Sequence, residues 1–359
     1  MVEIWTHALA SPRGVMKTAV DLEENGWDGL CVVDSQNLSG DPFVALAMAA
    51  TVTDRIGLGT GVSNSVTRIA ASTASAILSV DRISNGRALV GLGRGDSALA
   101  HIGRAPARMK QFEVYLRHLQ TYLQGGAVPF NEIEMSDDVA PAVSHLGLAD
   151  EPEESRITWH NGRGKKVPVE VAASGPLAIK VAARQADRIM FTLGADADRI
   201  AWGIDLAKQA RRDAGLDPEG IAFGAYINCV PGKDLDQTRD LARGGLATFA
   251  RFSVMHGKPN GPMSPVAAQA LQGLYDTYDM NKHTQDDSRQ ASGLPTDFID
   301  HFGVIGTPEK CIEKLRSLIA IGLDKLFFGV MFRLVQTQEG RTAKTLMEKE
   351  ILPELRQVS

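Results

Sequence analysis

The feature that most constrains this chain is a regular alternation between short apolar runs and longer segments with helical periodicity. Residues 29–34 form a nearly continuous apolar run, which is typical of a parallel strand buried on both faces. Asp41 and Pro42 follow with the cap and the first-position proline that begin a helix. The same order of strand and helix recurs along the chain. We expect strands at 2–9, 29–34, 56–62, 87–92, 167–172, 188–191, 221–230 and 325–330.

Eight strands with intervening helices favour an α/β fold of the (β/α)8 TIM-barrel class, and an open doubly wound sheet is the alternative. The length of 359 residues suits one barrel domain, 1–359, with insertions. The expected helices cover 12–25, 41–53, 70–82, 106–124, 176–185, 197–214, 235–251, 308–321 and 339–355.

Two polar segments interrupt the alternation, at about 126–166 and at about 253–303. Loops of this length in a compact domain are usually binding loops, lids or disordered. We expect 253–303 to close over the substrate, with Tyr275 and Tyr278 available to cover a flat ring.

Composition excludes several classes of partner. The formal net charge of −5 and the lack of a Lys/Arg run argue against nucleic acid. No stretch reaches the roughly 18 apolar residues of a membrane span, and the N-terminus does not resemble a signal peptide. Cys31, Cys229 and Cys311 are odd in number and far apart, which suits buried, reduced thiols in a cytoplasmic protein. Histidines, cysteines and carboxylates show no metal-ligand spacing, so we expect no metal.

Three segments that follow predicted strands would meet at one rim of a barrel. In 91–97, alternate glycines allow the backbone to approach a ligand closely. In 173–176, Ala-Ser-Gly-Pro leads into a helix whose N-terminus attracts phosphate. In 60–68, a small polar run separates strand from helix, and Ser65 or Thr67 would cap that helix. Each segment, taken alone, is also compatible with an ordinary turn.

Two residues are the candidate catalytic groups. Asp96 lies beside three glycines at the expected rim, and we expect it to handle a proton or to contact a cofactor ring. A carboxylate that only orders the glycine loop is the alternative. His7 lies near the end of the first strand, where barrel enzymes carry catalytic residues, and a structural role is its alternative. In the second insertion, His256 and His283 are in a position to face substrate.

Several motifs together resemble the luciferase-like monooxygenase superfamily. Within it, the chain is most similar to the methylenetetrahydromethanopterin reductase-like branch, which uses the deazaflavin coenzyme F420. The resemblance covers nearly the whole chain. It rests on the following segments in this order: 59–64 with 67–68, 81–87, 91–97, 103–106, 173–176 and 306–309.

The resemblance implies a bacterial luciferase-like barrel that binds flavin or deazaflavin at its carboxyl-terminal rim. It places the ring at the ends of the first four strands and the cofactor phosphate at 93–97 and 174–176. It also implies a cis peptide between Gly61 and Val62, behind the ring. The cofactor-binding residues that it implies are Asp34, Gly61, Val62, Ser63, Asn64, Gly93, Arg94, Gly95, Asp96, Ser97, Ser174, Gly175 and Pro176.

The chain departs from the family pattern after the second strand, where Asp34-Ser35-Gln36 replaces the common Asp-His and removes an imidazole. The resemblance implies an F420-dependent oxidoreductase that transfers a hydride between the deazaflavin C5 and a small organic substrate of unassigned identity. An FMN-dependent monooxygenase that uses reduced flavin and O2 is the alternative. A third hypothesis is a flavin-binding protein without catalysis.

Two helices favour a homodimer. The helix 106–124 carries an apolar stripe that Tyr115 and Tyr122 widen to a second side, and the helix 41–53 is apolar nearly all round. The resembling family commonly dimerises through helices that follow its early strands. We therefore expect a symmetric homodimer, with coverage of these helices by the two insertions as the alternative.

Overall fold

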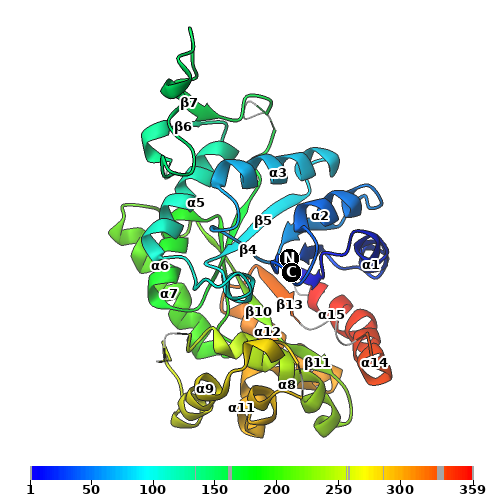
Figure 1. Ribbon diagram of the computed structural model, residues 1–359. Coiled ribbons are helices and arrows are strands. Elements are labelled where there is room, and N and C mark those ends of the chain that lie inside the picture. The colour runs from blue at the N-terminus through cyan, green and yellow to red at the C-terminus, as the bar shows by residue number, and fades with distance from the viewer. Residues whose placement is uncertain are drawn as a thin grey trace.

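The computed structural model describes residues 2–133, 135–160, 164–255, 257, 259–285, 287–329 and 335–357. At its centre, parallel strands close into a barrel surrounded by helices (Figure 1). Pairing of β3 with β5 closes the ring, which confirms the predicted barrel and excludes the open sheet. Around the barrel the strands are β3 (Gly57–Thr60), β2 (Gly29–Val32), β1 (Glu3–Ala8), β13 (Lys325–Phe328), β10 (Ala222–Ile227), β9 (Arg188–Phe191), β8 (Val169–Ala173) and β5 (Ala88–Gly93).

Each predicted strand coincides with an observed one, most with ends that differ by one or two residues, and two ranges differ further. The range 221–230 divides into β10 and β11 (Cys229–Pro231), and β11 pairs with β12 (Val304–Gly306) in a separate small sheet. The last strand ends at Phe328, and residue 330 lies outside the described residues. A short strand that was not expected, β4 (Ser63–Asn64), pairs with β5 at the rim.

The barrel helices begin where the sequence places caps and prolines. The Asp41 carboxylate accepts hydrogen bonds from the backbone N–H groups of Phe43 and Val44, and so caps α2 (Pro42–Ala50). The predicted helix 106–124 is α5 (Met109–Leu123), which begins three residues later than expected. The predicted C-terminal helix 339–355 consists of three consecutive elements, α14 (Gln338–Leu346), η4 (Met347–Ile351) and α15 (Leu352–Arg356).

The remaining helices around the barrel are α1 (Pro12–Glu24), α3 (Ala70–Ile83), α4 (Ser97–Ala100), α6 (Pro176–Gln185), α7 (Ala197–Asp213), α8 (Leu235–Arg251) and α12 (Pro308–Ala320).

A large side chain on one strand fills the barrel opposite glycines on its neighbours. A Cβ atom at Gly29 would lie 1.9 Å from the Trp5 ring, and one at Gly57 would lie 2.6 Å from it. Glycine at these two positions therefore makes room for the indole. The Lys325 ammonium lies 3.5 Å from the centre of the Trp5 ring. This packing supports the site from below.

The two interrupting segments occupy different places (Figure 1). The range 126–166 contains η1 (Phe130–Glu132), η2 (Val143–Leu146) and an antiparallel hairpin of β6 (Ala127–Pro129) with β7 (Glu154–Arg156). The range 253–303 lies beside α8. It contains α9 (Pro265–Thr277), η3 (Met280–Lys282), α10 (Arg289–Ser292) and α11 (Thr296–Phe302).

The tyrosines of α5 are covered within the chain. The Tyr115 hydroxyl donates to Thr73 Oγ1 at 2.7 Å, and the Tyr122 hydroxyl donates to Ser155 Oγ at 2.8 Å. Both tyrosines are buried, so the expectation that they leave a wet face for a partner was wrong. The reason is that α3 covers the first and the β6–β7 hairpin covers the second.

The outer face of α2 has a different character. Val44 is 52% exposed and Met48 is 36% exposed, although the inner face of the same helix is buried. The dimer therefore stays a prediction, and the exposed face of α2 is now its basis.

The three cysteines are free and buried. Within the described ranges, no helix combines the length and the apolarity needed to cross a bilayer.

Candidate functional site

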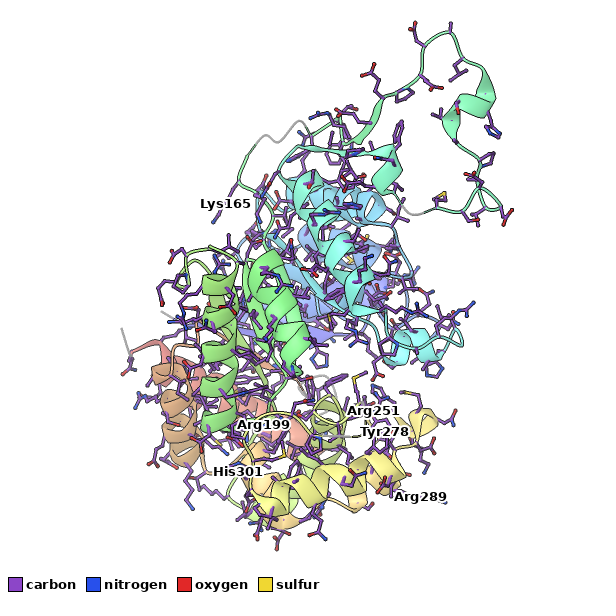
Figure 2. The ribbon with its side chains drawn as sticks, turned by 90° about the vertical axis from the view of Figure 1, so that its left-hand side faces the viewer. Lys165, Arg199, Arg251, Tyr278, Arg289 and His301 are labelled. Atoms are coloured by element: carbon purple, nitrogen blue, oxygen red, sulfur yellow. The ribbon has the colours of Figure 1, made fainter. Side chains whose placement is uncertain are left out.

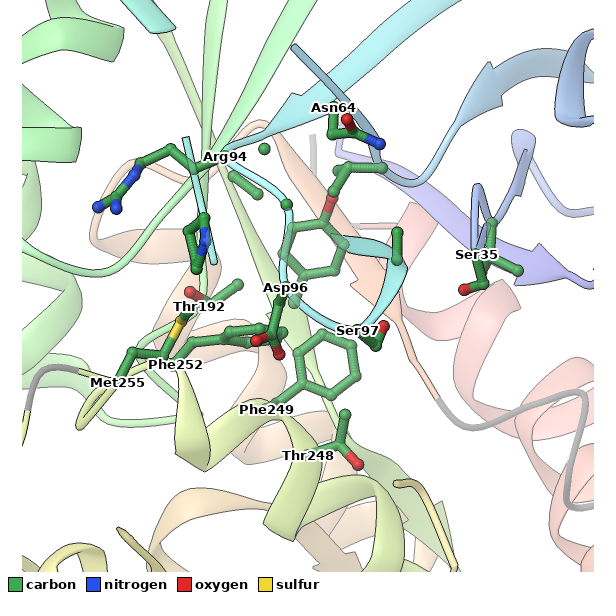
Figure 3. A pocket seen from close by; sticks show the side chains of 18 of the residues that line it. Ser35, Asn64, Arg94, Asp96, Ser97, Thr192, Thr248, Phe249, Phe252 and Met255 are labelled. Carbon is green, nitrogen blue, oxygen red and sulfur yellow. The ribbon is translucent and has the colours of Figure 1, made fainter. Parts of the chain in front are cut away.

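A cavity of about 840 Å³ lies at the carboxyl-terminal ends of the barrel strands (Figure 3). This end of a TIM barrel is where catalytic residues gather. The structure brings every candidate binding and catalytic residue into its lining, although their roles stay predictions. These residues are His7, Asp34, Gly61, Val62, Ser63, Asn64, Gly93, Arg94, Gly95, Asp96, Ser97, Ser174, Gly175 and Pro176.

The loops after β2 and β3 join at one side of the cavity. The peptide between Gly61 and Val62 is cis, as predicted. The Ser63 hydroxyl donates to Asp34 Oδ2 at 2.6 Å. Burial raises the pKa of Asp34, and this effect exceeds the opposing effects of the Ser63 hydrogen bond and of Arg68. The Asp34–Ser63 bond therefore holds a buried carboxyl group in the cavity wall.

Asn64 organises the segment between β4 and α3. Its Oδ1 accepts from the backbone N–H of Val66 at 2.9 Å and from that of Thr67 at 3.0 Å. The expectation that Ser65 or Thr67 caps α3 was wrong, because Ile69 precedes the helix and offers no side-chain cap. Asn64 Nδ2 is buried and has no hydrogen-bond partner among the described residues. The cavity wall thus keeps one unsatisfied amide donor.

Helix α6 presents its N-terminus to the cavity. Gly175 precedes the helix without a side-chain cap, and Pro176 takes the first helical position. A Cβ atom at Gly175 would meet only Asn260 Nδ2, at 3.9 Å, so this place is open. The Ser174 hydroxyl donates to the Phe252 carbonyl at 2.7 Å and fixes the turn against the end of α8. Uncapped N–H groups at a helix N-terminus attract anions, so the turn fits a phosphate group.

A buried arginine fixes the start of the second insertion beside this turn. Arg199 of α7 donates to the Asn260 carbonyl at 3.0 Å and to Ser253 Oγ at 3.1 Å (Figure 2). It is 2% exposed, and burial lowers its pKa. Because Asn260 lines the cavity, Arg199 positions part of the wall without touching the cavity itself.

Asp96 has a partner that the sequence did not suggest. Its carboxylate pairs with Arg251 at the end of α8, and the two side chains are 13% and 19% exposed. The Arg251 guanidinium also lies over the Tyr278 ring, 4.6 Å from its centre (Figure 2). Asp96 therefore ties the glycine loop to α8 and to the second insertion. The ion pair with Arg251 fits the alternative in which Asp96 orders the glycine loop. The other expectation, that Asp96 handles a proton, stays a prediction.

His7 is a neutral group in the cavity wall. Its ring stacks on Phe327 with a centroid distance of 5.6 Å and an interplanar angle of 3°. Burial lowers its pKa to about 4, so the imidazole is uncharged near pH 7. The neutral ring can form hydrogen bonds, but near pH 7 it lacks the second N–H proton that an imidazolium could donate as an acid.

An apolar wall completes the cavity, and sequence reasoning missed it. Figure 3 shows Phe249, Phe252 and Met255 together on one side, below Asp96. The spacing of Phe249 and Phe252 on one helix face was the available signal, but such a stripe equally predicts core packing. Met280 also lines the cavity.

The second insertion contributes other side chains than expected. Tyr275 is 47% exposed, and neither Tyr275 nor Tyr278 is among the lining residues. His283 does line the cavity, and His256 lies outside the described residues. In the part of the chain that the structure describes, no group of three His, Cys, Asp or Glu side chains could hold a metal ion.

Comparisons with known proteins agree with this geometry. Residues 2–325 match the family described as luciferase-like monooxygenase. The 5,10-methylenetetrahydromethanopterin reductase of Methanolobus tindarius is 26% identical over 310 residues, which cover 86% of this chain and 87% of that protein.

Two solved structures show the same fold. The coenzyme F420-dependent tetrahydromethanopterin reductase from Methanopyrus kandleri superposes with a TM-score of 0.72 at 20% identity, over 98% of this chain and 99% of that one. An F420-dependent secondary alcohol dehydrogenase, solved with an F420–acetone adduct, superposes with a TM-score of 0.71 at 16% identity, over 99% of each chain.

Proposed function

This chain belongs to the luciferase-like monooxygenase family, and we propose that it is an oxidoreductase that binds coenzyme F420 and exchanges a hydride with a small organic substrate. The observation that carries the proposal is the uncapped N-terminus of α6 at the edge of a cavity of about 840 Å³. That pairing suits a cofactor with a phosphate group and a flat ring. The F420-dependent enzymes of similar fold and the reductase of similar sequence support the choice of cofactor.

The residues present fit such a cofactor. The α6 N-terminus would hold the phosphate group, and the openness at Gly175 leaves room for it. The loop at Gly61 and Val62 would lie behind the ring, and Asn64 Nδ2 would supply a donor for one of its polar atoms. The cofactor, when bound, supplies the hydride chemistry, and the protein supplies binding and orientation.

The side chains of this protein shape the rest of the reaction space. Phe249, Phe252 and Met255 exclude water from one side of the cavity. His7, which is neutral, orients groups by hydrogen bonding without adding charge. Asp96 and Arg251 hold the glycine loop and the insertion together around the bound molecules.

An FMN-dependent monooxygenase is the second candidate, and the description of the matching family favours it. Both cofactors carry a flat ring and a phosphate group, so they would use the same strand ends and the same helix N-terminus. The relative affinity for F420 and FMN, and not the position of the site, therefore distinguishes the two proposals.

We also propose a cytoplasmic setting, which the three free cysteines support.

Parallel titrations with coenzyme F420 and with FMN test the proposal, with the quenching of cofactor fluorescence as the signal. We expect F420 to bind at least about tenfold more tightly, a difference of about 1.4 kcal/mol. Tighter binding of FMN would replace the first proposal with the second. Steady turnover with either cofactor would exclude a binding protein without catalysis.

A further inference from the structure

We propose that His283 donates a hydrogen bond from Nε2 to the substrate, which therefore carries a carbonyl or hydroxyl oxygen on an otherwise apolar frame. The inference rests on the proposed function, because it concerns the substrate side of the same cavity. His283 lies between η3 and α10 in the second insertion and is one of the residues that line the cavity.

His283 belongs to an insertion that packs on α8, on the Asp96 side of the cavity. Figure 3 shows Thr248 and Phe249 of α8 on the opposite side of the pocket from Asn64 and Arg94. The insertion lies beside α8, and His283 is close enough to Asp96 and Arg251 for their charges to affect it. His283 thus belongs to the wall that remains for substrate once a ring occupies the strand ends.

A hydrogen bond fixes one nitrogen of the His283 ring. The Tyr278 hydroxyl lies 2.6 Å from His283 Nδ1. Burial raises the pKa of Tyr278 to about 12, so the phenol keeps its proton. The Arg251 guanidinium over the phenol ring draws electron density from it and strengthens the hydroxyl as a donor. Thr248 is a second neighbour of the Tyr278 hydroxyl, and its own hydroxyl donates to the Gly244 carbonyl at 2.8 Å. Because the short contact of Tyr278 is with Nδ1, we infer that Tyr278 donates to Nδ1 and that Nδ1 accepts.

The other nitrogen then carries the hydrogen. Burial lowers the pKa of His283 to about 4, so its ring is neutral at pH 7. Asp96 opposes this shift, whereas Arg251 and His101 add to it. A neutral ring with Nδ1 as acceptor has its single N–H at Nε2. No described residue bonds Nε2, and His283 lines the cavity, so we infer that this donor serves a molecule bound there.

The charged side chains in and beside this part of the cavity, and the Asp34 carboxyl group, already have partners within the protein. Arg251 pairs with Asp96, and Ser63 bonds Asp34. Arg94 is the one lysine or arginine among the described lining residues, and its Nε donates to the Ala107 carbonyl at 2.8 Å. A negatively charged substrate would therefore find little compensation in this wall. A neutral, mostly apolar molecule with one oxygen acceptor fits it better.

Two probes of the same shape test the inference. Cyclohexanone has the oxygen acceptor, and methylenecyclohexane lacks it. We would measure the affinity of both for the enzyme loaded with whichever of F420 and FMN binds more tightly, through the fluorescence of the bound cofactor. We expect the ketone to bind about three- to tenfold more tightly, which is the effect of one net hydrogen bond.

Variants distinguish the loss of the His283 hydrogen bond from a general disturbance of the fold. His283→Leu should abolish the preference for the ketone. His283→Gln, whose amide N–H stands near the position of Nε2, should restore part of it. Tyr278→Phe should weaken the preference, because it releases the ring. His145→Leu and Tyr275→Phe are matched controls at exposed positions and should leave it unchanged.

Nitrogen NMR of the histidine rings adds a readout that does not depend on ligand. We expect the His283 ring at pH 7 to be neutral with its hydrogen on Nε2. A hydrogen on Nδ1, equal affinities of the wild-type enzyme for both probes, or an unchanged preference in His283→Leu would overturn the inference. Failure of the proposed cofactor appears separately, as weak F420 binding by the wild-type protein in the parallel titrations.

Discussion

The Lys325 ammonium lies 2.9 Å from each carboxylate oxygen of Glu170, and the two side chains are 0% and 4% exposed. Arg188 donates to the same carboxylate at 2.6 Å and links it to Glu3 at the end of the barrel. Charges removed from water need partners close by, and removal of one partner leaves the other uncompensated. These three side chains thus join β8, β9 and β13 beneath the cavity.

We predict that Lys325→Met lowers the free energy of unfolding by about 3–5 kcal/mol, because it leaves Glu170 with one cation in a buried place. Urea denaturation followed by circular dichroism measures the change. Lys349→Met, at an exposed position, is the control and should stay within about 0.5 kcal/mol. A loss below about 1 kcal/mol in Lys325→Met would contradict the prediction.

We predict that His7 makes the protein less stable as the pH falls from about 6.5 toward 4. Burial lowers the pKa of His7 from 6.5 to about 4 in the folded chain, so only the unfolded chain takes up the proton in this window. Stability therefore rises with pH here, by at most about 3 kcal/mol from this residue.

His7→Phe removes the titrating ring and keeps a flat side chain beside Phe327. The difference in unfolding free energy between wild type and variant, measured at pH 7 and at pH 5, isolates the contribution. The wild type should lose more stability than the variant over that interval. Equal losses would show that His7 titrates normally.

We predict that Gly175→Val weakens cofactor binding at least about tenfold while the fold is retained. The new side chain would occupy the open space at the N-terminus of α6. Fluorescence titration gives the dissociation constant, and the thermal midpoint reports the fold. Gly273→Val is a matched control, because Gly273 is an exposed helical glycine with open space around it. Unchanged affinity in a folded Gly175 variant would remove the phosphate assignment.

We predict that Asp96→Asn lowers kcat at least about tenfold and shifts the thermal midpoint by only a few degrees. The change keeps the shape of the side chain but weakens its link to Arg251. Turnover of cyclohexanol with oxidised F420 is the measurement. A double-mutant cycle with Arg251→Met then shows how much of the effect passes through the ion pair. Normal turnover in Asp96→Asn would leave Asp96 a purely structural residue.

We predict a homodimer that uses the exposed face of α2. Val44 and Met48 are large apolar side chains on that face, and a symmetric partner would cover them. Light scattering at micromolar concentration should give twice the chain mass of 38.6 kDa. The Val44→Glu, Met48→Lys double variant should be monomeric. A wild-type mass near 38.6 kDa would reject the dimer.

The barrel was predictable because its signals are local. Strands such as 188–191 and helices such as 176–185 and 235–251 were predicted with the bounds that the structure shows. A continuous apolar run marks a buried parallel strand, and a proline or an aspartate marks a helix start. The loops of the site followed from motifs within a few residues of strand ends.

The missed features depend on contacts between distant residues. Asp96 and Arg251 are separated by 155 positions, and no periodicity within either segment signals the pair. Tyr122 looked exposed because its cover, Ser155, belongs to an irregular insertion. Asn64, which closes the turn after β4, was overlooked because Ser65 and Thr67 lie closer to α3 and are good capping types, whereas α3 has no side-chain cap.

The packing of Trp5 against Gly29 and Gly57 has an evolutionary consequence. A side chain at either glycine would overlap the indole, so substitution there is tolerated only after Trp5 has become smaller. Shrinking Trp5 first would open a void next to the buried Lys325 ammonium. Each single step is therefore unfavourable, and only a coordinated change preserves the interior. These three positions should behave as an epistatic unit, so that sequences descended from this one change them together or retain them.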